Sequence, residues 1–268
     1  MSRRRVQVAA GPVIVAIALE IITAHATVLA GDGTIAWHLG RGDFALSLEI
    51  NESYNYVLVL ASWAEPRLTG LLSQLPAVKS VSPWIPTPIQ IVMPAGLTDA
   101  WACGVGTGYP IGKRKDGEPP KTPVRLLSGR FFIPADLTGQ AKIGVISRRL
   151  MLRAGFTDPM QVLGKSLLVS FDGGATRLEI KVVGVYQYET GPLVQSGGPA
   201  IGEFPKSVEL FMGVKEEDLL IPYSLVPSAK EQRHSQGHVV VTKPGEAART
   251  AEFLRQAFFG GLLTPQAG

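Results

Sequence analysis

Side chains that could carry catalysis or bind a metal are few in this chain, and their spacing does not suit either task. The four histidines are His25, His38, His234 and His238. Only the last two are close together, and their four-residue spacing would bring both imidazoles to one face only in a helix, whereas the residues that follow predict a strand. We therefore expect no metal site and no cofactor.

The glycine-rich segment "GVGTGYPIGKR", residues 104–114, looks superficially like a phosphate-binding loop. Three residues separate Gly108 from Gly112 where that motif has four, and Arg114 stands where a serine or threonine would bind magnesium. The nucleophile elbow G-x-S-x-G is also missing from the sequence. The acidic run Glu216–Asp218 is interpreted as a solvated turn ahead of a strand. The sequence thus predicts no catalytic residue, and we do not expect an enzyme.

Composition is that of a folded chain with a substantial core: 46% of the 268 residues are hydrophobic and 18% are charged. The formal net charge is +4, and the positive charge is concentrated in Arg3–Arg5 and in residues 111–130. No broad basic face is predicted, which argues against a nucleic-acid partner. Cys103 is the only cysteine, so an intramolecular disulfide is excluded, and we expect its thiol to be a small core group.

The N-terminal segment carries three arginines followed by an apolar run. It fits a secretory signal with an apolar region over 8–19 and a small-x-small cleavage site at 24–26. It equally fits a membrane helix over 9–30, which is long enough for a hydrocarbon core about 30 Å thick. Glu20 is unfavourable in both, costing about 2.5–3.5 kcal/mol near a bilayer centre. A buried helix of a soluble protein is the third alternative. Either of the first two places residues 31–268 outside the cytoplasm.

Strand and helix patterns alternate at both ends of the chain. Residues 54–62 predict a strand, and leucines at i, i+3, i+4 and i+7 predict a helix over 65–75. Two short strands, 78–84 and 89–94, are expected to be separated by prolines. Near the C-terminus, 238–242 predicts a strand, and 244–261 a helix whose apolar face is formed by Ala247, Ala251, Leu254 and Phe258.

The middle of the chain is mainly β in pattern. We expect a strand over 142–147, a helix over 147–156 capped by Ser147, and a hairpin of 165–171 with 177–188 turning at Asp172-Gly173-Gly174. Residues 31–52 are expected to be a loop or weak strand, and 189–206 a long Gly- and Pro-rich loop.

The predicted fold class is therefore α+β with two lobes. An α/β lobe of split βαβ type is formed by 31–120 and 211–268, and a mostly-β lobe, 121–210, is inserted between its halves. One N-terminal hydrophobic helix, within 1–30, precedes both lobes.

The order of motifs from "GRFF" (129–132) resembles a known family. An Asp at 136, the strand and helix "IGVISRRL", the pair Gly164-Lys165, and "IKVVGVYQ" with Gly184 follow in turn. This set resembles the extracytoplasmic (periplasmic) core domain of MacB/FtsX-like ABC transporter permeases. It is densest over 124–188 and extends over about 65–260.

The resemblance assigns fold-determining roles to a set of residues. Gly129 should permit a sharp exit from a strand, and Arg130 should pair with a carboxylate, Asp136 being the candidate. The two phenylalanines should diverge to opposite sides of an extended chain, so that at least one enters the core, and Gly184 should relieve crowding in the second hairpin strand. The full set is Gly129, Arg130, Phe131, Phe132, Asp136, Gly164, Lys165 and Gly184.

In the family, this domain lies outside the membrane and relays conformational change driven by a cytoplasmic ABC ATPase. The resemblance therefore implies a non-catalytic domain, an indirect ATPase partner reached through a membrane-spanning permease, a periplasmic or envelope protein as a second partner, and an uncleaved signal anchor over 7–29. Only "GGLLTPQAG" follows Phe259, so a truncated, split or accessory form is expected. The alternative is a secreted or periplasmic binding module of the same fold. Candidate partner contacts are Lys113, Arg114, Lys115, Gln195 and Phe204.

Overall fold

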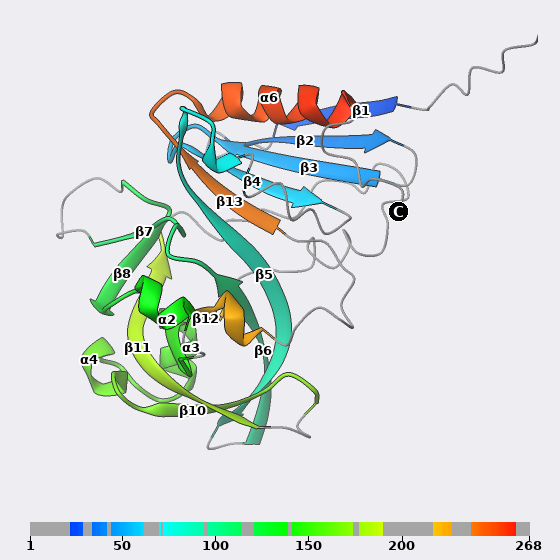
Figure 1. Cartoon of the computed structure of the whole chain (residues 1–268). Coiled ribbons are helices and arrows are strands. Elements are labelled where there is room, and N and C mark those ends of the chain that lie inside the picture. Colours follow the sequence, from blue (N-terminus) through cyan, green and yellow to red (C-terminus); the bar gives the residue numbers. More distant parts are fainter. Residues whose placement is uncertain are drawn as a thin grey trace, which may run out of the picture.

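The computed structural model describes residues 22–28, 34–41, 44–61, 70, 72–93, 96–113, 121–138, 141–173, 177–189, 217–226 and 237–260 (Figure 1). The strands are β1 (Ile22–Val28), β2 (Thr34–Arg41), β3 (Phe44–Asn51), β4 (Tyr56–Ala61), β5 (Val78–Met93), β6 (Gly96–Val105), β7 (Ile111–Gly112), β8 (Val124–Gly129), β9 (Ile143–Ser147), β10 (Ser166–Ser170), β11 (Leu178–Tyr188), β12 (Leu219–Pro222) and β13 (Gly237–Thr242). The helices are α2 (Pro134–Thr138), α3 (Arg148–Arg153), α4 (Pro159–Val162), the 3₁₀ turn η1 (Tyr223–Leu225) and α6 (Ala247–Phe259). The described residues form a mixed fold of mostly strands and few helices.

One group of strands runs in the order β1-β2-β3-β4-β13-β5, and every neighbouring pair in it is antiparallel. Helix α6 covers this sheet (Figure 1). Its predicted apolar face is confirmed, since Ala247, Ala251, Leu254 and Phe258 are all buried. They pack in one cluster with side chains of β3 and β4. Helix α6 ends at Gly260, whose N–H donates to the Gln256 carbonyl at 2.8 Å.

A second group closes on itself. Among the described residues, β5, β6, β12, β9, β11 and β10 follow one another in a ring, because β10 pairs both with β11 and with β5. Strand alternation sends one face of each strand into a shared core that includes Ile91, Ala102, Ile146, Val169 and Ile221. Helices α3 and α4 add Leu150, Met151 and Val162 to this core. The predicted hairpin of β10 and β11 and the cap of α3 by Ser147 are confirmed.

Strand β5 belongs to both groups, and here the prediction of two short strands is wrong. It is one continuous strand of 16 residues. Its first half pairs with β13 up to Trp84, and β10 takes its place from Gln90 onward. Pro86 and Pro88 fall between these limits. Backbone N–H groups two residues apart point to the same side of a strand. Pro86 and Pro88 therefore lack hydrogen-bond donors only in the interval between β13 and β10, where β5 has no partner strand on that side.

The N-terminal strands also differ from expectation. Residues 34–41 and 44–51, expected as a loop or weak strand, form the full hairpin β2–β3. Residues 22–28 of the predicted hydrophobic helix form β1, which pairs with β2 from Ile22↔Arg41 to Val28↔Ile35. The part of the 9–30 alternative that overlaps β1 is therefore extended, and the hydrophobic helix within 1–30 stays a prediction. Residues 1–21 lie outside the described part.

No helix in the described ranges is long and apolar enough to cross a bilayer. The predicted lobe boundaries near residues 120 and 210 stay a prediction. Strand β12, which follows the second boundary, pairs with β6 and β9 in the ring.

Candidate functional site

Two neighbouring acidic residues ahead of β12 lie in the interior. Glu217 is 1% exposed and Asp218 is 2% exposed, so the interpretation of these residues as part of a solvated turn is wrong. Burial of ionisable groups is costly unless each finds partners, and the two side chains find different ones. Glu217 faces an aromatic cluster, and Asp218 faces two arginines at a pocket.

The Glu217 cluster consists of Glu217, Trp84, Tyr109, Tyr186 and Tyr188. The Trp84 indole N–H donates to Glu217 Oε1 at 2.7 Å, and the Tyr188 hydroxyl donates to Glu217 Oε2. The Tyr186 hydroxyl donates to the Glu217 backbone carbonyl at 2.6 Å, and the hydroxyls of Tyr109 and Tyr188 are 3.2 Å apart. The cluster ties the middle of β5 to the end of β11 and to the start of β12.

Burial, reinforced by the nearby negative charge of Glu217, raises the pKa of the Tyr109, Tyr186 and Tyr188 phenols well above the ordinary value. The phenols therefore stay protonated near neutral pH and remain hydrogen-bond donors. Burial likewise raises the pKa of the Cys103 thiol, with Glu217 adding to the effect. The expectation that Cys103 is a small core group is confirmed, because it is fully buried.

Asp218 is held mainly by one arginine. Arg149 on α3 donates from Nε at 3.1 Å and from NH2 at 2.9 Å to Asp218 Oδ1, and the Trp101 backbone N–H is 3.4 Å from Oδ2. Arg153, one turn further along α3, places NH1 3.7 Å from the same Oδ1. Two cations thus converge on one buried carboxylate.

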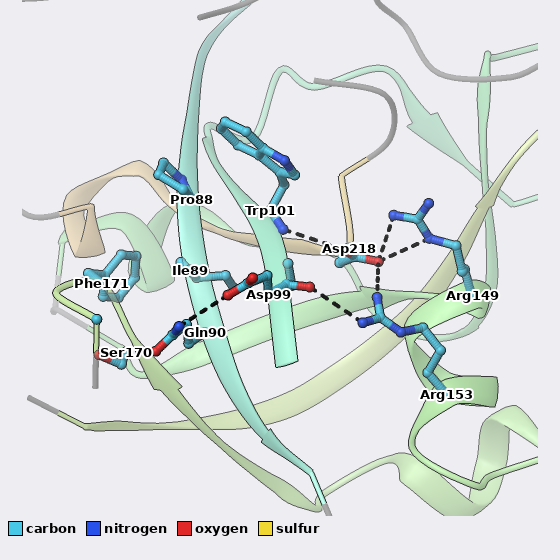
Figure 2. Close-up of a pocket in the computed structure, with 12 residues that line it drawn as sticks. Pro88, Ile89, Gln90, Asp99, Trp101, Arg149, Arg153, Ser170, Phe171 and Asp218 are labelled. Atoms are coloured by element: carbon cyan, nitrogen blue, oxygen red, sulfur yellow. Dashed lines mark hydrogen bonds and ion pairs between the residues drawn. The ribbon is translucent and has the colours of Figure 1, made fainter. Parts of the chain in front are cut away.

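A pocket of about 780 Å³ opens beside Asp218 and the two arginines (Figure 2). We call it the Asp218 pocket. It is bounded by β5, β6, α3, the end of β10 with the turn after it, and the residue before β12. The lining residues are Pro88, Ile89, Gln90, Asp99, Ala100, Trp101, Arg149, Arg153, Ser170, Phe171, Gly173 and Asp218.

The sequence analysis missed this site, although one signal for it was available. Two acidic residues directly before the apolar run "LLIP" must sit at a strand entrance, and arginines at 149 and 153 share one helix face. What no pattern reveals is that β12 enters the sheet beside α3. That neighbourhood depends on non-local strand pairing between β12, β6 and β9.

The residues assigned by the family resemblance gather elsewhere, around the end of β8. Arg130 and Asp136 form the expected ion pair, with NH1 2.6 Å from Oδ2 and NH2 3.1 Å from Oδ1. The Ile133 N–H also donates to Asp136 Oδ2 at 2.9 Å. The Arg130 side chain lowers the pKa of the Asp136 carboxyl.

The expectation that Phe131 and Phe132 diverge is wrong, whereas the expectation that at least one of them enters the core is confirmed, because Phe132 is buried. Both pack against the same apolar cluster, and their ring centroids are 4.6 Å apart. Gly129 has φ +76°, which turns the chain so that the two residues are not part of an extended strand. The expected sharp exit at Gly129 therefore explains why strand alternation does not apply to the pair.

The remaining motif glycines lie in the hairpin. Gly164 has φ +76° and precedes β10, and its N–H donates to the Val182 carbonyl at 2.8 Å. Lys165 is exposed, and its carbonyl accepts from the Val182 N–H. A Cβ on Gly184 would lie 2.5 Å from the Arg130 carbonyl oxygen, so this glycine does relieve crowding.

Of the candidate partner contacts, only Lys113 is described, and it is exposed. Arg114, Lys115, Gln195 and Phe204 lie outside the described residues. His238 is buried on β13, and burial lowers its pKa to about 4. Within the described ranges, no three His, Cys, Asp or Glu side chains gather in a way that could hold a metal ion.

Comparison with known proteins yields structural matches only. No protein-family model matches the chain, and no curated protein matches it. The periplasmic region of MacB from Actinobacillus actinomycetemcomitans is 16% identical, with a TM-score of 0.49, over 78% of this chain and 85% of that one. The extracellular domain of the noncanonic ABC-type transporter YknZ from Gram-positive bacteria is 17% identical, with a TM-score of 0.46, over 74% and 85% of the two chains. The first is a periplasmic region and the second an extracellular domain.

Proposed function

We propose that this chain is a non-catalytic extracytoplasmic domain of the MacB/FtsX-like permease type, which relays conformational change to a partner outside the membrane. The ordered motifs between residues 124 and 188 support the proposal, together with the way the structure uses them. Gly129, Gly184 and the Arg130–Asp136 pair all shape one junction at the end of β8. A relay must hold its shape, and we propose that these residues serve this purpose.

The observation that carries the proposal is the continuity of β5. Its backbone hydrogen-bonds to β13 in the sheet under α6 and to β6 and β10 in the ring. At the change-over, Trp84 is fixed to Glu217, and Glu217 to Tyr188 on β11. We therefore expect a displacement of the α6 sheet to move the ring with it, since pulling Trp84 away from Glu217 would break a buried hydrogen bond.

The distance between the α6 sheet and the ring tests this relay. Arg249 on α6 and exposed Glu179 on β11 would each be replaced by cysteine and spin-labelled. The full chain would carry Cys103→Ala so that no other cysteine reacts. We expect one narrow distance distribution. A broad or two-peaked distribution would show that the groups move independently and would overturn the relay.

The proposed partners are a cytoplasmic ABC ATPase, reached through a membrane-spanning permease, and an envelope protein outside. An affinity-tagged full chain would be purified from bacterial membranes in mild detergent. Recovery of an ATPase and a helix-rich permease supports the proposal, provided that a Gly129→Ala variant, with its distorted junction, recovers less of them. Recovery of the chain alone, in amounts equal for both variants, would refute it.

Three further parts of the proposal concern regions that the structure leaves out in whole or in part. We propose membrane anchoring by the segment preceding β1, and lobe boundaries near residues 120 and 210. We also propose partner contacts through the basic residues 113–115 and through the 189–206 segment. Deleting 190–206 without loss of partner recovery would remove the last of these contacts.

A second candidate function is a released periplasmic or secreted binding module of the same fold. The Asp218 pocket favours it, because a concave site of this size is typical of small-molecule binding. The intact mass of the mature chain decides between the anchored relay domain and the released binding module. An uncleaved chain in the membrane fraction after alkaline washing supports the anchored domain, and a soluble chain that has lost its N-terminal segment supports the module.

A further inference from the structure

We propose that the Asp218 pocket binds a small amphipathic monoanion: a carboxylate with an apolar chain and a hydrogen-bond donor between them, such as an N-acyl amino acid. Arg153 would contact the carboxylate. This assignment goes beyond the relay function, because a rigid relay requires no small-molecule site. It depends on the charge, the unsatisfied polar group and the apolar wall of the pocket.

The charged side chains of the lining, Arg149, Arg153, Asp99 and Asp218, balance in sign but are unevenly paired. Arg149 already makes a two-nitrogen contact with Asp218, at 3.1 and 2.9 Å, which compensates that carboxylate. Arg153 makes only long contacts, 3.7 Å from Asp218 Oδ1 and 3.4 Å from the Asp99 carbonyl oxygen. Its side chain is 37% exposed. Arg153 is thus the cation with hydrogen-bonding capacity left for a ligand.

Gln90 supplies the second polar observation. Its Nε2 donates to Asp99 Oδ1 at 3.1 Å, while its buried Oε1 has no hydrogen-bond partner among the described residues. An unsatisfied buried acceptor is unfavourable, and a donor on a ligand would satisfy it once the Gln90 side chain rotates to bring Oε1 to the pocket surface. An amide N–H or hydroxyl near the carboxylate of the ligand fits this requirement.

The rest of the lining is apolar. Pro88 is exposed, and Trp101 and Phe171 are partly buried. All three line the pocket, and Trp101 also packs against the apolar cluster that contains Trp84. Figure 2 shows Pro88 and Phe171 at the opposite end from Arg149 and Arg153. A volume of about 780 Å³ accommodates an acyl chain of roughly ten carbons with its head group, and lies within the usual range for ligand pockets.

The test uses N-(11-bromoundecanoyl)glycine, whose bromine quenches tryptophan fluorescence on contact. We expect saturable quenching of the full chain, and loss of most of that quenching in Trp101→Phe. Arg153→Gln should weaken binding about tenfold, or about 1.4 kcal/mol. Arg148→Gln is the matched control, since Arg148 is an exposed arginine on α3 that does not line the pocket. It should bind like the wild type.

The uncharged amide of the same probe separates charge recognition from apolar binding. It should bind more weakly than the acid, and equally to the wild type and Arg153→Gln. Three results would each overturn the proposal: no saturable quenching in the wild type, unchanged quenching in Trp101→Phe, or equal affinities of Arg153→Gln and Arg148→Gln. Urea midpoints of all variants are measured alongside. If Arg153→Gln is unfolded, Arg153→Lys takes its place, and it should retain most of the affinity. None of these results depends on an ATPase partner, so the relay proposal is tested separately.

Discussion

Gly129 and Gly164 form a matched pair that measures what close backbone packing contributes at the end of β8. Both have φ +76°. A Cβ at Gly164 would meet nothing within 4 Å, whereas one at Gly129 would overlap the Val183 carbonyl oxygen and lie 2.9 Å from the Gly184 Cα. An alanine at either site adopts the left-handed conformation at a cost of about 1–2 kcal/mol. Only at position 129 must the alanine Cβ also displace neighbouring backbone atoms.

The free energies of unfolding should differ accordingly. Gly164→Ala should lower the free energy of unfolding by about 1 kcal/mol, since alanine also restricts the unfolded chain. Gly129→Ala should lower it by about 3 kcal/mol, because overpacking against fixed atoms adds about 2 kcal/mol. Urea unfolding of the full chain, followed by circular dichroism, measures both. Equal losses for the two variants would refute the argument that Gly129 is required by the close approach of β11.

Three other predictions follow from single groups. Phe258→Ala, which empties a fully buried site under α6, should cost about 3–5 kcal/mol of unfolding free energy in the same assay, and a loss below 1 kcal/mol would contradict the packing described for α6. His238 has a folded pKa of about 4 against an ordinary value near 6.5, so the unfolded state binds the extra proton between these values and stability should fall as pH drops from about 6.5 to 4. His238→Gln should flatten that part of the stability profile, and an unchanged slope would contradict the assignment. Asp136 has a lowered folded pKa, so its contribution is present above its unfolded pKa of about 4 and is lost as pH falls through the folded value. Asp136→Asn should remove this contribution and lower the free energy of unfolding by about 1 kcal/mol at neutral pH, a small value because Arg130 is partly exposed. Identical stability–pH profiles of the wild type and Asp136→Asn would refute the prediction.

Local chemistry was predictable wherever a short segment determines its own structure. The cap of α3 by Ser147, the apolar face of α6 and the hairpin of β10 and β11 each depend on neighbours in sequence. The Arg130–Asp136 pair was equally predictable, since the partners are only six positions apart and a tight turn lies between them.

Features that depend on distant pairing were not predictable. Prolines in β5 suggest a break, and only the positions of β13 and β10 show why the strand continues through them. Glu217 and Asp218 look like surface residues until Trp84 and Arg149 are brought beside them from other strands and helices.

The extracytoplasmic location of the folded domain is the central claim, and cysteine labelling tests it most directly. Arg249, whose side chain is 83% exposed on α6, is replaced by cysteine in a Cys103→Ala background of the full chain. Intact bacteria are treated with a membrane-impermeant maleimide, with a cytoplasmic protein as the control for leakage. We predict that intact cells label Cys at 249 as fully as lysed cells do. Labelling that appears only after lysis would place the domain in the cytoplasm and contradict the claim.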